Sequence, residues 1–106
     1  MPKIAIIRCD DYADTCAGFK CFPALRERTG AFAAYEGGLE TVGFDTCGGC
    51  DRNKADKIVA RARRLKEKGA EAIHLGNCLT SVCPWTDLFA ESIARQVALP
   101  VVRGTH

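Results

Sequence analysis

The sequence has no apolar run long enough to cross a lipid bilayer, and its first residues do not form a secretion signal. The longest apolar stretch, 4–7, falls far short of the roughly 20 residues that a transmembrane helix needs. The opening Met1-Pro2-Lys3 lacks the charged, apolar and cleavage regions of a signal peptide. These absences predict a cytoplasmic chain with no membrane partner.

The sequence also lacks a strong excess of positively or negatively charged residues. The formal net charge is only +2, whereas strong nucleic-acid binders usually carry a clustered basic face. Basic residues are frequent between 54 and 68, but Asp56 and Glu67 lie among them and no aromatic residue interrupts them. Such a run usually forms the solvated face of a helix. We therefore expect no nucleic-acid partner.

Cysteine is the residue type that stands out. Seven cysteines among 106 residues remain below the share of roughly 8–10% that is typical of small secreted disulfide scaffolds. An odd number cannot pair completely within one chain, and the cytosol keeps most thiols reduced. The count favours a metal site, a cluster or thiol chemistry over a disulfide framework.

Four short apolar segments predict strands at 3–8, 39–44, 71–75 and 100–103. Between them, one helix is indicated by a single apolar stripe that has Asp51 or Asn53 at its start and Gly69 at its end. The stripe consists of Ala55, Ile58, Val59, Ala62 and Leu65. A shorter helix is expected around Pro23, with a further helical turn over 31–35.

The last predicted helix begins at Pro84. Its expected inner face consists of Trp85, Leu88, Phe89, Ile93 and Val97. The alternation of strands and helices predicts a single α/β domain over residues 1–106, a three-layer sandwich with a four-stranded parallel sheet and about three crossover helices.

Chemically reactive side chains follow the predicted strands. In an open parallel sheet the carboxyl ends of all strands meet at one edge, where ligand sites form. We therefore expect the thiols and imidazoles to gather at that edge: Cys9, Cys16, Cys21, Cys47, Cys50, His74, Cys78, Cys83 and His106. The segment 10–14 adds three aspartates that could supply a carboxylate ligand or a hydrogen-bond acceptor.

The most specific local pattern is Cys47-Gly48-Gly49-Cys50, at a predicted strand-to-helix turn. A two-residue spacer lets both sulfurs approach one metal ion, and glycines let the backbone turn tightly. The positive end of the following helix would lower the thiol pKa values and favour thiolates. This pattern suits a metal site and a redox site equally.

The leading hypothesis is a metal-binding protein, with zinc as the default ion because Zn²⁺ takes four Cys or His ligands without redox demands. Its candidate ligands are Cys9, Cys47, Cys50, His74, Cys78 and Cys83. For His74 the alternative is a core histidine that is hydrogen-bonded within the sheet. The surplus of candidates also permits an iron–sulfur cluster.

Two other classes of function compete with a functional metal centre. One is a thiol–disulfide oxidoreductase with Cys47 as the nucleophile and Cys50 as the resolving thiol. The other is a small regulatory or scaffold module with a purely structural metal. The sequence leaves open whether Cys16, Cys21 and His106 are metal ligands or only loop or lid residues. It also leaves open whether the protein catalyses any reaction.

Over nearly its whole length the sequence resembles the CGGC-domain family, small prokaryotic proteins described as metal-binding on account of their cysteines and histidines. The residues that carry the resemblance are Ile6 to Cys9, the loop from Cys16 to Phe22, Arg26 to Phe32, Gly43-Phe44, Thr46 to Cys50, Ile73 to Leu75, Cys78, Cys83-Pro84 and Gly104 to His106. The resemblance implies a zinc or other metal site and no established reaction.

Overall fold

The structure, a computed structural model, describes residues 2–106 and has an α/β architecture. Its strands are all parallel and form one sheet in the order β2-β1-β3-β4. Their bounds are β1 (Lys3–Arg8), β2 (Glu40–Thr46), β3 (Ala72–Leu75) and β4 (Val101–Arg103). The predicted four-stranded parallel sheet is confirmed.

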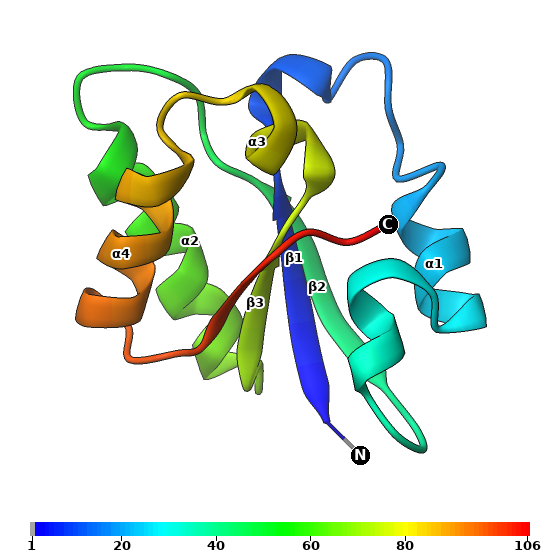
Figure 1. The fold of residues 1–106 in the computed structure, drawn as a ribbon. Coiled ribbons are helices and arrows are strands. Elements are labelled where there is room, and N and C mark those ends of the chain that lie inside the picture. The colour runs from blue at the N-terminus through cyan, green and yellow to red at the C-terminus, as the bar shows by residue number, and fades with distance from the viewer. Residues whose placement is uncertain (1) are drawn as a thin grey trace.

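Helices cover both faces of the sheet (Figure 1). On one face lie α2 (Lys54–Glu67) and α4 (Thr86–Gln96), and on the other lie α1 (Cys21–Glu27) and the 3-10 helix η2 (Gly30–Ala34). Two short elements, η1 (Asp10–Tyr12) and α3 (Asn77–Val82), directly follow β1 and β3 at the carboxyl edge. Among residues 2–106, no helix combines the length and apolarity that crossing a membrane would require.

The core is divided between the two faces because successive side chains of a strand point in opposite directions. In β1, Ala5 and Ile7 pack with α2 and α4, whereas Ile4 and Ile6 pack with α1 and η2. All four are completely buried. This double coverage explains why β1 is a continuous apolar run instead of an alternating one.

Helix α2 confirms the predicted apolar stripe. Ile58, Val59, Ala62 and Leu65 are buried, and the chain leaves the helix through Gly69 at φ +110°. That left-handed conformation is accessible to glycine without a Cβ penalty. At the other end, Asn53 is the N-cap residue but makes no side-chain capping hydrogen bond.

Two predictions for residues 76–97 were wrong. No helix was predicted between the third strand and Pro84, but residues after Gly76 form α3, which buries Leu79. Helix α4 begins at Thr86 instead of Pro84. Its buried residues are Thr86, Phe89, Ala90, Ser92 and Ile93, and Val97 is buried at its C-cap. Trp85 is the N-cap residue of α4, and Leu88 lies on the side of the helix away from its buried residues. Both side chains are exposed.

Candidate functional site

The carboxyl ends of β1 and β3 form the natural crevice of this sheet. These strands are neighbours, yet the chain leaves β1 toward α1 on one face and leaves β3 toward α4 on the other. Ligand sites of open α/β sheets lie at such divergence points. Cys9 and Cys78 stand on its two sides, and the backbone N–H of Cys9 donates a hydrogen bond to Sγ of Cys78 over 3.2 Å.

Beside this crevice is a cavity of about 180 Å³, which we call the thiol pocket. Three separate connections build it: η1 after β1, the loop after β2, and the turn between α3 and α4. Its lining consists of Cys9, Asp11, Tyr12, Cys50, Val82, Cys83 and Pro84. Three of the predicted ligands therefore share one cavity although they are far apart in sequence.

The loop 47–50 is held against α2 through its glycine backbone. A Cβ at Gly48, where φ is +92°, would lie 2.9 Å from Nε of Arg61 and 3.2 Å from Cβ of Lys57. Only glycine allows this approach without displacing a neighbour.

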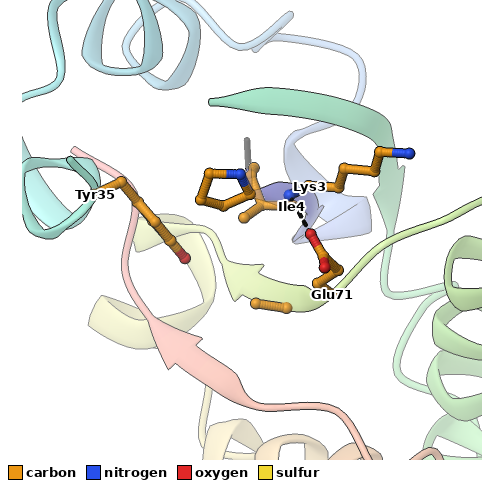
Figure 2. Close-up of a pocket in the computed structure, with 6 residues that line it drawn as sticks. Lys3, Ile4, Tyr35 and Glu71 are labelled. Carbon is orange, nitrogen blue, oxygen red and sulfur yellow. Dashed lines mark hydrogen bonds between the residues drawn. The ribbon is translucent and has the colours of Figure 1, made fainter. Parts of the chain in front are cut away.

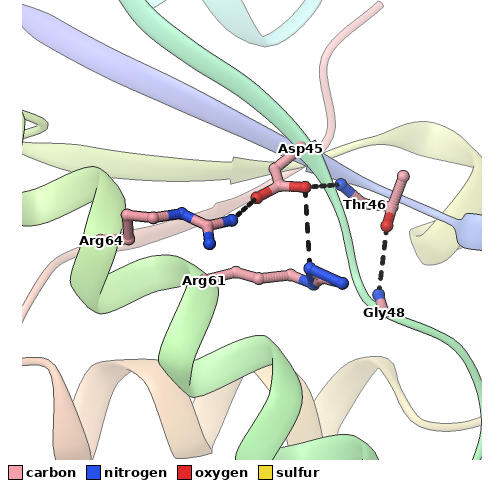
Figure 3. Close-up of polar contacts among 5 residues, drawn as sticks. All are labelled: Asp45, Thr46, Gly48, Arg61 and Arg64. Atoms are coloured by element: carbon pink, nitrogen blue, oxygen red, sulfur yellow. Dashed lines mark hydrogen bonds and ion pairs between the residues drawn. The ribbon is translucent and has the colours of Figure 1, made fainter.

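Polar contacts at the end of β2 fix the start of the same loop (Figure 3). The N–H of Gly48 donates to Oγ1 of Thr46 over 3.3 Å, and the N–H of Thr46 donates to Oδ1 of Asp45 over 2.7 Å. Asp45 in turn accepts a 2.7 Å hydrogen bond from Arg64 of α2 and lies 3.9 Å from Arg61. The loop is thus tied to α2 by charge as well as by packing.

The two cysteines of the loop differ in accessibility. Cys47 is 1% exposed and belongs to the core that α2 and α4 cover, whereas Cys50 is exposed at the pocket. Desolvation raises the pKa of Cys50, and the nearby Asp11, Cys47 and Cys83 raise it further against a smaller opposing effect of Lys54. The expected lowering by a helix start was wrong for Cys50, because α2 begins only at Lys54.

Burial also raises the pKa of Cys9, and the neighbouring Cys47, Asp11 and Cys78 raise it further, while a backbone hydrogen bond from Asp11 lowers it. Cys9, Cys47, Cys50, Cys78 and Cys83 therefore form one electrostatically linked group, which we call the thiol cluster. Within it, neighbouring thiols contribute to the raised pKa values of Cys9 and Cys50, as like charges do at close range.

The thiols are near one another but do not surround a common point. All seven cysteines are free. Within residues 2–106 no three Cys, His, Asp or Glu side chains are arranged so that they could hold a metal ion as they stand. The donor chemistry of the thiol cluster fits a thiophilic metal, whereas the present side-chain positions do not provide a closed coordination sphere.

His74 lies away from the thiol pocket, on the face that α1 and η2 cover. It is completely buried. Its Nδ1 lies 3.0 Å from the carbonyl oxygen of Gly104, and its Nε2 lies 2.7 Å from the hydroxyl of Tyr35. Because a carbonyl only accepts, Nδ1 carries the proton and Nε2 accepts from Tyr35. Both ring nitrogens are therefore engaged within the protein.

The remaining candidates are also near the carboxyl edge. Cys21 is buried, with Sγ 3.3 Å from Oγ1 of Thr105. Cys16 is partly exposed, and backbone N–H groups of Gly18 and Phe19 lower its pKa. His106 is positioned by Asn77, whose side-chain amide donates to the carbonyl oxygen of His106 over 2.6 Å.

A larger cavity, about 430 Å³, is at the opposite end of the sheet and contains no thiol (Figure 2). Pro2, Lys3, Ile4, Tyr35, Glu71 and Ala72 line it. There Oε1 of Glu71 accepts a 2.8 Å hydrogen bond from the backbone N–H of Lys3. This cavity shares no lining residue with the thiol pocket.

A family model described as the CGGC domain matches residues 3–106. The chain belongs to the CGGC-domain family. This CGGC domain is also 38% identical, over 114 aligned positions, to an uncharacterised protein of Methanocaldococcus jannaschii, covering 98% of this chain and 86% of the relative. No solved structure matches it. Metal binding is suggested for the family without a specified ion.

Sequence reasoning missed the apolar part of the pocket in this CGGC domain. Tyr12, Val82 and Pro84 line it beside the thiols. The only sequence signal for Tyr12 was its position just after β1. Val82 could not be assigned because a six-residue helix such as α3 is too short to display a period.

Proposed function

We propose that this CGGC domain binds a thiophilic divalent metal ion, zinc by default, at the thiol pocket. The residues that would hold the ion are Cys9, Cys50 and Cys83, which line the pocket, with Cys47 and Cys78 beside them. Bound there, the ion would supply two positive charges to a group of thiolates. The observation that carries the proposal is that three thiols from three separate connections line one cavity, with two further thiols close to them.

Electrostatics supports this proposal. Burial and the neighbouring thiols and Asp11 raise the pKa values of Cys9 and Cys50, so ionising these two thiols together is unfavourable without a compensating charge. A divalent cation provides that charge, and its binding releases the thiol protons. The cluster suits the reducing cytoplasm, where thiols stay available for a metal.

The redox alternative has less support from the structure. Cys47, the nucleophile suggested by the sequence, is almost completely buried, and the accessible Cys50 has a raised pKa. A thiol nucleophile normally needs exposure and a lowered pKa. His74 is outside our proposed ligand set because its two ring nitrogens are already hydrogen-bonded.

The experiment is a metal analysis of the full chain purified anaerobically under reducing conditions, followed by a zinc titration against a competing chelator. We expect bound zinc at a constant ratio to protein, and at least a tenfold loss of affinity in Cys50→Ser and Cys83→Ser. Cys16→Ser is the matched control, because Cys16 lies outside the pocket lining, and it should bind zinc as the wild type does.

Three outcomes would contradict this assignment. A wild-type protein that binds no zinc would refute the proposed ion. Equal losses in Cys16→Ser and Cys83→Ser would show that the pocket is not the site. A brown protein that contains iron and sulfide would replace zinc by an iron–sulfur cluster on the same thiols.

A further inference from the structure

The thiol pocket presents two accessible thiols beside the apolar side chains of Tyr12, Val82 and Pro84 and the exposed carboxylate of Asp11. We propose that a second copy of this chain covers the pocket and that Cys50 and Cys83 of each copy together form one four-thiolate metal site, in which the two thiols of the second copy take the place of the buried Cys9. This inference rests on the proposed function, since it requires metal binding at the pocket. It adds the partner that completes the site.

The first support is the incomplete donor set of one chain. A structural zinc site has four protein ligands in a tetrahedron, but within residues 2–106 no three suitable side chains converge. Cys50 is exposed and Cys83 is partly exposed, whereas Cys9 and Cys47 are buried. Two-fold symmetry is the commonest symmetry of homo-oligomers, and it would bring two accessible thiols from each copy around one axis.

The second support is the exposed apolar surface next to these thiols. Val82 is 63% exposed, and Tyr12 is 41% exposed. Both line the thiol pocket. Trp85, also 41% exposed, directly follows the lining residue Pro84. Large apolar side chains gathered around one pocket indicate a surface that a partner covers.

The third support is the charge on the elements that border the pocket. The segment 10–14 presents the exposed carboxylates of Asp10, Asp11 and Asp14. The start of α2 presents the opposite sign through Arg52 and Lys54, and Nζ of Lys54 lies 4.2 Å from the ring centre of Trp85. A two-fold axis that runs between these two segments would place the acidic segment of one copy opposite the basic segment of the other. Such complementarity favours a second copy over an unrelated partner.

The test is a zinc titration of the full chain in the presence of a phosphine reductant, followed by light scattering on a sizing column. We expect a monomer in chelator and a dimer with zinc, at one zinc ion for two chains. Because the chain has a single tryptophan, Trp85 fluorescence gives a second readout: zinc should protect it from acrylamide quenching.

Two matched variants locate the interface. Val82→Asp introduces a charge among the apolar side chains of the pocket at an exposed position and should abolish the zinc-dependent dimer while leaving the circular dichroism spectrum unchanged. Phe19→Asp is the control, since Phe19 is 71% exposed and does not line the pocket. This variant should still dimerise with zinc.

The outcomes separate this inference from the proposed function. A monomer that holds one zinc ion per chain would overturn the second copy and retain the metal site. A chain that binds no zinc would refute both. A dimer that persists in chelator, or in Cys50→Ser with zinc, would show that the metal does not join the copies.

Discussion

The hydroxyl of Tyr35 donates a 2.7 Å hydrogen bond to Nε2 of the buried His74. Because Nδ1 of the same ring donates to Gly104, this contact joins η2, the central strand β3 and the segment after β4. The imidazole thus acts as a link between three parts of the fold, apart from the thiol pocket.

Tyr35→Phe should therefore destabilise the protein. The change leaves Nε2 of His74 buried without a donor, which costs about 1–3 kcal/mol. Urea unfolding followed by circular dichroism measures the loss. Zinc affinity should stay within twofold of the wild type. A variant as stable as the wild type would show that the hydroxyl contributes nothing to the link.

Stability should also fall in mild acid because of His74. Burial lowers the pKa of His74 below its usual 6.5, with a smaller opposing effect of the Gly104 hydrogen bond. Above pH 6.5 the imidazole is neutral in both states, and the stabilisation is complete. Below pH 6.5 the unfolded chain takes up the proton first, so the free energy of unfolding decreases until folded His74 is protonated too.

The measurement is urea unfolding between pH 7.5 and 5.5 with bound metal removed. The slope approaches about 1.4 kcal/mol per pH unit when one proton is taken up on unfolding. His74→Gln should flatten this dependence. An unchanged slope in that variant would assign the pH effect to other groups.

The two glycines of the loop 47–50 should differ in their tolerance of alanine. Both have positive φ values, +92° for Gly48 and +106° for Gly49, so both substitutions strain the backbone. Only at Gly48 does a Cβ also meet Arg61 and Lys57, whereas at Gly49 the nearest atom is Oδ1 of Asp51 at 3.6 Å. Gly48→Ala should therefore cost about 1–3 kcal/mol more than Gly49→Ala in thermal or urea unfolding. Equal losses would contradict the packing described for this loop.

Cys16 should be alkylated faster than Cys50 at pH 7, although Cys50 is the more exposed residue. Backbone hydrogen bonds lower the pKa of Cys16, while desolvation and neighbouring charges raise that of Cys50. The thiolate is the reactive form, so the larger thiolate fraction decides the rate. Iodoacetamide labelling followed by peptide mass spectrometry gives both rates in one sample. Faster labelling of Cys50 would show that exposure outweighs the pKa difference.

The sheet and the edge that bears the thiols followed from local patterns. Strand β1 is a continuous apolar run because both of its faces are covered, and α2 shows a clear apolar stripe. Because the predicted strands were parallel, a cysteine that follows a strand in the sequence was expected at the carboxyl edge of the sheet.

Side-chain direction was less predictable. Whether His74 faces the thiols or the opposite layer depends on its pairing with Ile6 and on which helix covers that face. The difference in burial between Cys47 and Cys50 likewise depends on how the loop lies on α2. Such features arise from tertiary packing, which a single sequence does not encode in a local pattern.

The central position of β1 has a consequence for the order in which the protein folds. Its partners are residues 40–46 on one side and 72–75 on the other, so β1 precedes both partners in the chain and completes its backbone hydrogen bonds only when both have been made. Pairings between segments so far apart in sequence slow folding. Cys9 therefore stays accessible until most of these residues have been made.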